Sequence, residues 1–328
     1  MPDTSSAPPV SVCLTTYNRA HRLPAVLDSL LAQDFSDFEL IISDDCSSDH
    51  TQEVGSEYSR RDGRVRYVRN AKNLGMPGNL NSVVQQARGM YIAIVHDDNI
   101  YRQDLLAKWK SALDAFPDAP FVFNDYDTIH PDGSRRVYRM TSGNFVRGTE
   151  IATHYFKTVT CAVFATVMMR RTALVKAGPF DSTFGFISDV DMWLRLARDA
   201  ENIAYVPEPL ITIYPREPHH PYRHVHWRHV FWSLGIYTKH LRFYHETHPD
   251  LVAPYVSAYP RLRRRYMFRS MAYLVKYRQW QRVREGLAIW RDADDFFLKR
   301  LGYLFGTPRW RPDWYHPGWW KMASAPRL

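Results

Sequence analysis

Short apolar runs alternate with amphipathic stretches through the first hundred residues, and this rhythm constrains the fold most strongly. The fourth of these apolar runs, Met90–Val95, is apolar on both faces, as an interior parallel strand must be. A helix is predicted over Leu23–Leu31 from its apolar spacing, and another over Asn79–Arg88. The rhythm predicts an α/β fold with a mostly parallel, doubly wound sheet, which binds ligands at the carboxyl ends of its strands. The strand-length runs are Val10–Leu14, Phe38–Ile42, Val65–Val68 and Met90–Val95.

The chain of 328 residues exceeds one average domain, so one large domain or two smaller ones are expected. In residues 119–215 a helix is predicted at Asp189–Ala200, and strands at Phe121–Phe123, Val163–Met169 and Ile211–Tyr214. Pro-rich turns follow, and three further helices are predicted at Arg223–His245, Tyr255–Arg278 and Trp280–Leu304. We therefore expect a disordered N-terminus at 1–8, a catalytic domain at 9–215, and a basic, aromatic-rich helical region at 216–328.

The basic residues gather in the last third of the chain. Residues 1–205 hold 22 Lys and Arg against 25 Asp and Glu, whereas residues 206–328 hold 21 against 9. Two interpretations of this basic part stay open: an interfacial helix lying on anionic lipid, and a solvated basic face over an ordinary core. No recognised nucleic-acid motif is present and the front half is acidic, so no nucleic-acid partner is expected. The residues concerned include Arg261, Arg263, Arg264, Arg265, Tyr266, Phe268, Tyr273 and Trp280.

Cysteine usage and the lack of long apolar runs bear on the compartment. Cys13, Cys46 and Cys161 are odd in number and widely spaced, which argues against a disulfide framework and fits a reducing environment. The polar N-terminus does not have the pattern of a secretory signal, and no apolar run approaches the ~18–20 residues of a membrane span. These features predict a cytoplasmic protein, with peripheral contact at the inner face of the cell membrane as the lipid-binding interpretation.

Acidic residues fall where the predicted strands end. Asp44 and Asp45 follow the second strand, beside the polar segment 15–19 that follows the first. A carboxylate at a strand end can accept hydrogen bonds from a nucleotide base or from ribose hydroxyls. The alternative is a turn in which Ser48 or Asp49 caps the next helix. The spacing alone leaves both interpretations open.

A second acidic group, His96–Asn99, follows the buried strand directly. Because adjacent carboxylates repel each other, holding Asp97 and Asp98 at the end of a buried strand is costly unless a cation or ligand hydroxyls compensate. Carboxylate oxygens suit Mg²⁺ or Mn²⁺, and these ions often share their coordination with substrate phosphates. An exposed acidic turn that opens the next helix is the alternative.

A third acidic group, Asp189 and Asp191, falls at the start of a predicted helix. Residues two apart do not share a helix face, so one can point into a cleft while the other caps the helix or pairs with Arg195. Two ordinary first-turn acids are the alternative.

Several common enzyme signatures are missing. The segment after the first strand, Thr15–Ala20, contains no glycine, which excludes a dinucleotide-binding loop there. The sequence has no phosphate-binding G-x-x-x-x-G-K-[ST] loop, no G-x-S-x-G, no H-E-x-x-H and no C-x-x-C. These absences leave the three acidic groups as the main chemical signal of the front half.

At these positions the sequence resembles family 2 glycosyltransferases of the GT-A fold. His96–Asn99 is similar to the Asp-x-Asp region of that family, and Asp97–Tyr101 is especially similar to the spore-coat polysaccharide type. The motifs occur in order and at the family's spacings over residues 9–215, so the resemblance is specific. The other matching segments are Val10–Arg19, Leu30–Phe35, Ser43–Asp49, Asn73–Gly75, Asn79 and Gly89–Ile92.

The resemblance implies roles for individual residues. Asp44 is expected to hold a uracil base and Asp97 to contact the ribose. Asp98 is expected to hold Mn²⁺ or Mg²⁺ against the diphosphate, and Asp189 matches the catalytic base. Two positions depart from the pattern, because His96 replaces the first acid of the Asp-x-Asp motif and Ser188 replaces a common Glu. The nucleotide pocket is expected to be lined by Thr15, Tyr17, Asn18 and Arg19.

The resemblance also implies an activity. We expect metal-dependent, inverting transfer of a single sugar from a nucleotide-diphospho-sugar to a glycan or lipid-linked acceptor, in polysaccharide, glycolipid or cell-envelope glycan synthesis. Asp191 and Trp193 are candidates for a donor or acceptor pocket. His219 is a candidate metal ligand, with a solvated loop histidine as the alternative. The alternative functions are a nucleotide-sugar-binding protein without turnover and a basic nucleic-acid-binding protein.

Overall fold

The computed structural model describes residues 7–164, 166–214, 226–276, 278 and 280. These residues form two compact units. The first unit holds those within 1–220 together with Gly235–Tyr255, and the second holds those within 221–234 and Val256–Leu328. His219, most of the predicted N-terminal tail and nearly all of the predicted helix Trp280–Leu304 lie outside the described residues.

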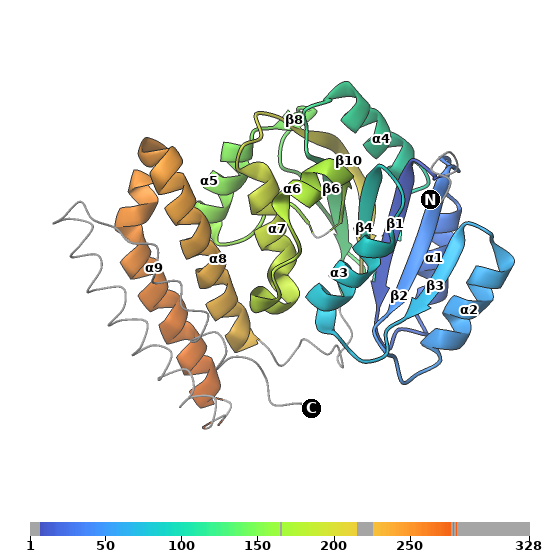
Figure 1. Cartoon of the computed structure of the whole chain (residues 1–328). Helices are drawn as coiled ribbons and strands as arrows, with labels where there is room; N and C mark the ends of the chain where they lie inside the picture. The colour runs from blue at the N-terminus through green and yellow to red at the C-terminus, as the bar shows by residue number, and fades with distance from the viewer. Residues whose placement is uncertain (1–6, 165, 215–225, 277, 279, 281–328) are drawn as a thin grey trace. The chain divides into compact units, whose positions relative to one another are not determined.

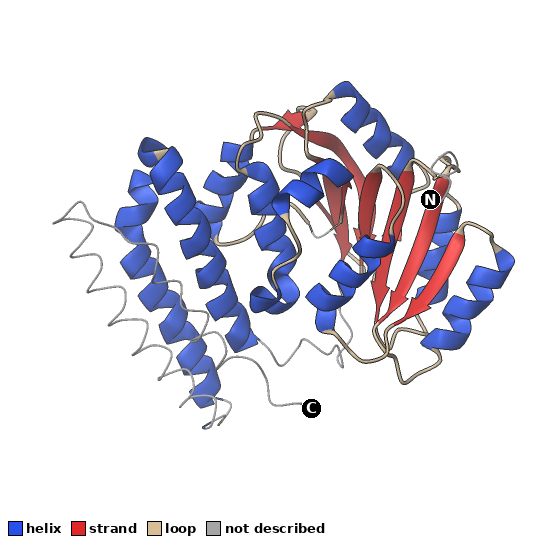
Figure 2. Ribbon diagram, in the orientation of Figure 1, coloured by secondary structure: helices blue, strands red, loops and turns tan. Residues whose placement is uncertain are grey.

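The first unit is built on a mixed sheet (Figure 2). Its main path runs in the order β3-β2-β1-β4-β9-β6-β10-β5, with β7 paired to β6 and β8 to β10. The strands are β1 (Val10–Thr16), β2 (Phe38–Asp44), β3 (Val65–Arg69), β4 (Tyr91–His96), β5 (Asn99–Tyr101), β6 (Phe121–Ile129), β7 (Arg135–Tyr138), β8 (Phe145–Val146), β9 (Val167–Arg170) and β10 (Ile203–Ile213).

Strands β1 to β4 form the parallel half of this sheet. β1 pairs in parallel with β2 and β4, and β2 with β3. In this register Thr16 lies opposite Asp44, and Thr15 lies opposite His96. β9 runs antiparallel to both β4 and β6, so β6 points the same way as β4. The α/β fold with a mostly parallel sheet is confirmed, and the carboxyl ends of β1, β2 and β4 meet at one edge.

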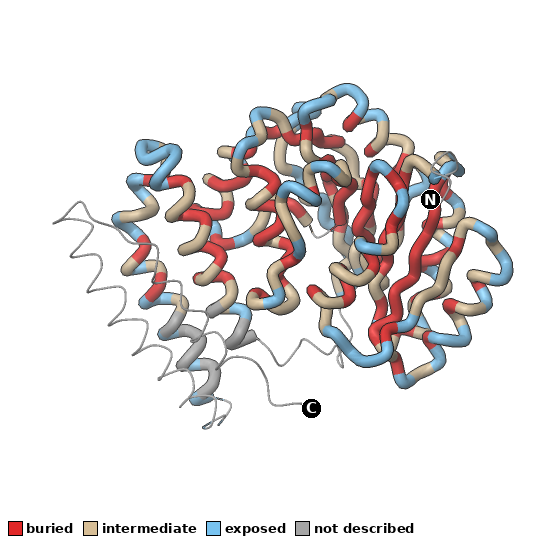
Figure 3. Tube along the Cα trace, viewed as in Figure 1, coloured by how far each residue is buried: buried red, intermediate tan, exposed pale blue. Residues whose placement is uncertain are grey.

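Helices cover both faces of the parallel half. Alternate residues Val10, Val12 and Leu14 of β1 share a buried core with apolar residues of α1 and α4, while α3 packs on the opposite face (Figures 1 and 3). Both faces of β1 are buried, and only alternate residues belong to this core because the strand pleat sends neighbouring side chains to opposite faces. The helices are α1 (Leu23–Leu31), α2 (Thr51–Arg61), α3 (Gly75–Gln86), α4 (Leu105–Ala115), α5 (Gly148–Thr158), α6 (Arg171–Ala177) and α7 (Ser188–Ala197).

Gly148 lets α5 approach the end of α7 closely. A β-carbon at this position would lie 1.9 Å from the carbonyl oxygen of Ala197, a distance no side chain could adopt without displacing the backbone. The amide of Gly148 also donates to the carbonyl of Ala200 over 3.0 Å. The C-terminal end of α7 is therefore fixed against α5.

Two long helices follow, α8 (His226–Thr247) and α9 (Pro249–Lys276). They confirm the helical C-terminal part predicted at Arg223–His245 and Tyr255–Arg278, with boundaries shifted by a few residues. α8 begins in the second unit and ends in the first, since Gly235–Tyr255 belongs to the first unit. No helix within the described part of the chain is both long and apolar enough to cross a membrane.

Candidate active site

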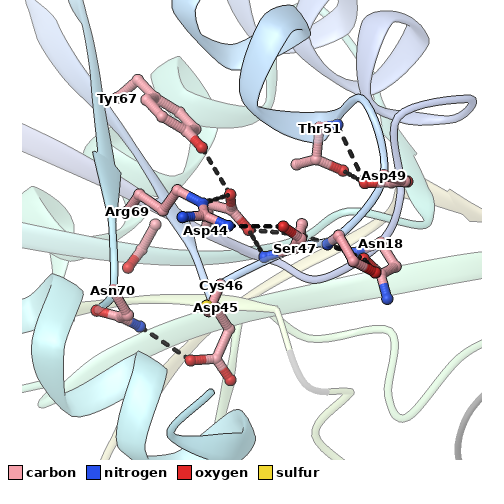
Figure 4. Close-up of polar contacts among 12 residues, drawn as sticks. Asn18, Asp44, Asp45, Cys46, Ser47, Asp49, Thr51, Tyr67, Arg69 and Asn70 are labelled. Atoms are coloured by element: carbon pink, nitrogen blue, oxygen red, sulfur yellow. Dashed lines mark hydrogen bonds and ion pairs between the residues drawn. The ribbon is translucent and has the colours of Figure 1, made fainter. Parts of the chain in front are cut away.

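Hydrogen bonds join the loop after β1 to the loop after β2. The amide of Asn18 donates to Oγ of Ser47 over 2.8 Å, and Oδ1 of Asn18 accepts from the amide of Ser48 over 2.8 Å (Figure 4). Asn18 has a φ of 53°, in the left-handed region that Asn tolerates better than most residues. Two segments that the sequence placed at neighbouring strand ends therefore form one connected surface.

Asp44 lies at the end of β2 and is fully buried. One carboxylate oxygen accepts from the amide of Ser47 over 3.0 Å and also from its hydroxyl. The other accepts from the Tyr67 hydroxyl over 2.6 Å and lies 3.4 Å from Nε of Arg69 (Figure 4). Asp44 thus connects the ends of β2 and β3, and a nucleotide base that contacts it must replace one of these partners or add to them.

Asp45 and Asp49 anchor helices. Asp45 accepts hydrogen bonds from the amides of Leu74 and Gly75, over 2.8 and 2.9 Å, at the start of α3. Burial raises the pKa of Asp45 in spite of these donors. Asp49 accepts from the amide of Thr51 over 3.0 Å at the start of α2. The N-cap of α2 is His50, which makes no side-chain cap hydrogen bond, so neither Ser48 nor Asp49 is the cap that one interpretation predicted. Asp49, the residue before the N-cap, holds the first residue of the helix instead, and the sequence did not predict the anchoring of α3 by Asp45.

The acidic pair follows β4 directly. The Tyr101 hydroxyl donates to the carbonyl of His96 over 2.8 Å and accepts from its amide over 2.7 Å, which fixes the end of the strand. Asp97 and Asp98 form the turn between β4 and β5, and both are half-buried. Burial, with the charge of Asp98, raises the pKa of Asp97 to about 6, although Arg19 and His96 act in the opposite direction. The raised pKa of Asp97 is therefore the energetic cost expected when two adjacent carboxylates are held at the end of a buried strand.

This turn has the chemistry of a divalent-cation site, with few protein ligands. Within the described ranges, no group of three or more His, Cys, Asp or Glu is arranged to hold a metal ion. Asp97 and Asp98 offer hard oxygen ligands, and a nearby positive charge would relieve the raised pKa of Asp97. Mg²⁺ or Mn²⁺ fits such a pair if the remaining ligands are water and phosphate oxygens.

Asp189 lies in the first turn of α7 and is 8% exposed. Its Oδ1 is buried and has no hydrogen-bond partner among the described residues. Burial raises the pKa of Asp189, and the charge of His96 partly opposes this effect. Because His96 acts electrostatically on both Asp97 and Asp189, the structure brings the end of β4 and the start of α7 into the same neighbourhood.

Asp191 and Trp193, the two pocket candidates, are both fully buried in the core. Asp191 pairs with Arg195, as one sequence interpretation of this helix predicted, with Nε and Oδ2 2.9 Å apart. It also contacts Lys239 and His240 of α8. With no exposed surface on either residue, the structure does not support the predicted pocket role.

The remaining predicted nucleotide-binding residues extend from the end of β1. Thr15 is half-buried, and Tyr17 is 38% exposed. Nε of Arg19 lies 3.9 Å from Oδ1 of Asp97, which connects this loop to the acidic turn. Sequence reasoning missed Ser47, Tyr67, Arg69, Lys239 and His240. The alternation of Tyr67 and Arg69 along β3 was the available signal for two of them.

Comparison with known protein families decides the classification of this molecule. Residues 11–178 match the model described as Glycosyl transferase family 2. The chain belongs to glycosyl transferase family 2. The matched part includes the ends of β1, β2 and β4 but stops before Asp189. Family membership is therefore shown by the strand ends of the candidate site and not by Asp189.

Curated relatives of this family 2 glycosyltransferase match part of its length. One is the Escherichia coli protein named UDP-Glc:alpha-D-GlcNAc-diphosphoundecaprenol beta-1,3-glucosyltransferase WfgD, which is 29% identical over 192 residues, covering 58% of this chain and 70% of the relative. The first matches span from 20% to 70% of the relatives' own length.

Solved structures share the GT-A-like fold at low sequence identity. Staphylococcus aureus TarS 1-349 in complex with UDP-GlcNAc superposes with a TM-score of 0.56 at 16% identity, covering 87% of this chain and 92% of that one. The mannosyltransferase PcManGT from Pyrobaculum calidifontis, in complex with GDP-Man and Mn²⁺, gives 0.56 at 17% identity, covering 88% and 87%. The predicted fold of this family 2 glycosyltransferase is thereby confirmed.

Proposed function

We propose that this protein is an inverting glycosyltransferase that moves one sugar from a UDP-sugar to a hydroxyl group of a glycan or lipid-linked acceptor. The observation that carries the proposal is Oδ1 of Asp189, a buried carboxylate oxygen without a hydrogen-bond partner among the described residues, near the acidic turn. The name of the E. coli relative supports a UDP-sugar donor and a diphosphoundecaprenol-linked acceptor. The product would belong to a polysaccharide, a glycolipid or a cell-envelope glycan.

The donor nucleotide is assigned to the connected loops after β1 and β2. Asp44 is proposed to hold the uracil and Asp97 the ribose. The Arg19 guanidinium, close to Asp97, supplies positive charge beside the phosphates. The likeness of Asp97–Tyr101 to the spore-coat polysaccharide type supports this arrangement without specifying the sugar. The pocket lining is completed by Thr15, Tyr17 and Asn18.

The acidic turn is assigned to the diphosphate. Asp98 would hold Mn²⁺ or Mg²⁺ there, with Asp97 adding negative charge beside it. A bound cation would neutralise the charge that develops on the departing nucleoside diphosphate. The hydrogen bonds between Tyr101 and His96 keep the turn at a fixed place on the sheet edge.

Asp189 is assigned the role of general base. Its carboxylate takes the proton of the acceptor hydroxyl while that oxygen forms a bond to the anomeric carbon and the bond from this carbon to the phosphate oxygen breaks. A single displacement inverts the anomeric configuration, as in inverting glycosidases. The raised pKa of Asp189 makes it a stronger base than an exposed aspartate.

An exposed face of α9 is the proposed contact with an anionic membrane. Arg261, Arg264, Arg265 and Phe268 are all exposed and recur at helical spacing, and Trp280 is 58% exposed. Arginine with exposed aromatics is the composition of helices that lie at lipid headgroups. This contact would place the enzyme in the cytoplasm, at the inner face of the membrane. Flotation with phosphatidylglycerol vesicles, and none with phosphatidylcholine, is expected; equal recovery with both rejects the contact.

A donor screen tests the proposed function. Thermal unfolding is measured with Mn²⁺ and a panel of UDP-, GDP- and dTDP-sugars, because a ligand that binds the folded state raises the midpoint. We expect a UDP-sugar to give the largest shift, and the same sugar to be transferred with inversion as followed by NMR. Binding without transfer to any acceptor would favour a silent binding protein. Binding of DNA or RNA in place of nucleotide sugars would favour the nucleic-acid alternative.

A further inference from the structure

A buried ionic cluster joins α7 to α8 within the first unit. Asp191 on α7 is completely buried, and its Oδ1 lies 2.8 Å from Nζ of Lys239 and 3.0 Å from Nε2 of His240. Its Oδ2 accepts from Nε of Arg195 over 2.9 Å. One carboxylate therefore has two hydrogen-bond partners and one further ion-pair partner, and two of these three side chains come from α8.

The protonation states follow from the surroundings. Burial by itself would raise the pKa of Asp191, yet the hydrogen bond from His240 and the charges of Lys239 and Arg195 hold it well below its usual range. Burial lowers the pKa of His240 to about 4, so its ring is neutral at pH 7 and donates from Nε2 to Asp191. The cluster is thus a carboxylate held by two cations and one neutral donor.

Stability alone does not explain such a cluster. Well-packed apolar residues often stabilise a fold as much as a buried ion pair does, whereas the geometry of an ion pair is more specific. Here the specified geometry is that of the first turn of α7, because Asp191 lies two residues after Asp189. A shift of this turn would move Asp189 directly.

The same cations also hold the segment that leads into α7. Nζ of Lys239 lies 3.3 Å from Oδ2 of Asp181 and 5.0 Å from the ring centroid of Phe184 in the short helix η2 (Ser182–Ile187). Arg195 donates to the carbonyls of Ala177 and Pro179, the latter over 2.8 Å. The start of α7 is therefore fixed from both directions along the chain.

We propose that Lys239 and His240 are positioning residues for sugar transfer, which act through Asp191 to hold Asp189 where it can take the acceptor proton. This inference rests on the proposed function, since it assumes that Asp189 is the base. It gives the second half of α8 a part in the reaction without contact with either substrate.

The test compares Lys239→Met with wild-type enzyme and with Arg242→Met. Arg242 also lies on α8, and its ion pair with Glu246, 3.1 Å from Nε to Oε1, is at the surface. Because displacement of a catalytic group by 1 Å can cost about 100-fold in rate, we expect Lys239→Met to lower kcat by at least about 10-fold. The KM for the donor should stay within about twofold of wild type, and Arg242→Met should match wild type.

A pH profile separates positioning from a purely structural role. Among the described residues, His96 and Cys161 are titratable groups that act on Asp189, and Lys239→Met changes neither. A loosened first turn would hydrate Asp189 and lower its pKa, so the acidic limb of kcat should move to lower pH in Lys239→Met. Lys239→Arg should largely restore both the wild-type kcat and the wild-type position of the acidic limb.

The outcomes separate failure of this inference from failure of the proposed function. Activity is expressed per folded molecule, counted by UDP binding, so partial unfolding does not imitate a loss of kcat. Lys239→Gln, which keeps an amide donor, supplies the same comparison if Lys239→Met does not fold. If Lys239→Met or Lys239→Gln keeps the wild-type kcat and the acidic limb of its kcat–pH profile does not shift, this inference is overturned and the proposed function is not. Wild-type enzyme without transferase activity, or an active Asp189→Asn variant, overturns the proposed function instead.

Discussion

The Tyr67 hydroxyl donates to Oδ2 of Asp44 over 2.6 Å, and this bond joins β3 to the end of β2. A second bond of the same type lies elsewhere in the unit, where the Tyr58 hydroxyl donates to Asp28 over 2.7 Å. Burial raises the pKa of both tyrosines, to about 12 for Tyr58, so both hydroxyls keep their protons at neutral pH. The two bonds form a natural comparison, because only the first borders the predicted nucleotide pocket.

Tyr67→Phe is expected to weaken UDP binding by about 5- to 10-fold, because Asp44 loses a partner worth about 1–3 kcal/mol. Tyr58→Phe removes a similar bond, and it should lower the unfolding midpoint by about as much as Tyr67→Phe does. Calorimetry with UDP and Mn²⁺ distinguishes the two variants, since Tyr58→Phe should bind like wild type. Equal UDP affinity in all three proteins would remove Asp44 from the nucleotide site.

Asp189→Asn is expected to lower kcat by about 10²–10⁴-fold while UDP affinity stays unchanged, because only proton transfer is lost. Asp199→Asn, an exposed change just after α7, is the control and should keep wild-type turnover. Single-turnover transfer from the UDP-sugar measures the chemical step. Near-normal turnover of Asp189→Asn would show that another group is the base.

The same substitution is expected to stabilise the folded protein at neutral pH. Burial raises the folded-state pKa of Asp189, so the bound proton stabilises the fold at low pH and this contribution is lost as the pH rises through the folded pKa. Asparagine has no proton to lose. The midpoint of Asp189→Asn should therefore exceed that of wild type above about pH 4, with a difference that grows toward pH 7. A lower midpoint at pH 7 would contradict this expectation.

Removal of divalent cations is expected to stop transfer, and Mn²⁺ or Mg²⁺ to restore it. Since the pKa of Asp97 is about 6, its negative charge is lost as the pH falls through 6 and cation binding should weaken. We expect the half-saturating Mn²⁺ concentration to rise by about fourfold from pH 7.5 to 5.5. Asp98→Asn should raise it further at every pH, whereas Asp104→Asn, which breaks an ion pair with Arg102 just before α4, should not. Full activity in EDTA would exclude the metal.

Gly55→Ala is expected to disturb the nucleotide site from a distance. A β-carbon at Gly55 would lie 2.3 Å from Cδ2 of Tyr67, so the ring must shift and its hydroxyl bond to Asp44 should be disturbed. Overpacking of this kind costs about 1–3 kcal/mol and outweighs the gain of about 1 kcal/mol from alanine in a helix. UDP affinity should fall together with the unfolding midpoint. Gly63→Ala, which meets nothing within 4 Å, should change neither.

Much of the parallel half of the sheet could be predicted from sequence. Strands β1 to β4 begin within one residue of their predicted starts, because each is a short apolar run bounded by polar turns. The predicted strand Val163–Met169 was wrong at its start, since β9 begins at Val167. Val163 is buried in a loop, and apolar content alone does not distinguish a buried loop from a strand. The start of α5 depends on the close approach of Gly148 to Ala197, which no local pattern encodes.

The acidic turn and the buried Asp189 were accessible from sequence because strand ends and helix starts are local features. The surroundings of Asp191 were not, because His240 is 49 residues away and belongs to a helix with no chemical motif. The same limit applies to Asp44, whose partners Tyr67 and Arg69 come from a neighbouring strand. Residues that organise a site through distant contacts need the folded chain.

The division of α8 between the two units has a practical consequence for anyone who shortens this protein. A polypeptide that stops at residue 215 would retain every strand of the described residues but lose Lys239 and His240, and Asp191 would stay buried without these two partners. Loss of a partner from a buried pair costs about 3–5 kcal/mol, a large share of the stability of a domain. Expression of the front part alone should therefore yield aggregated material, whereas extension through Tyr255 retains both side chains and should stay soluble.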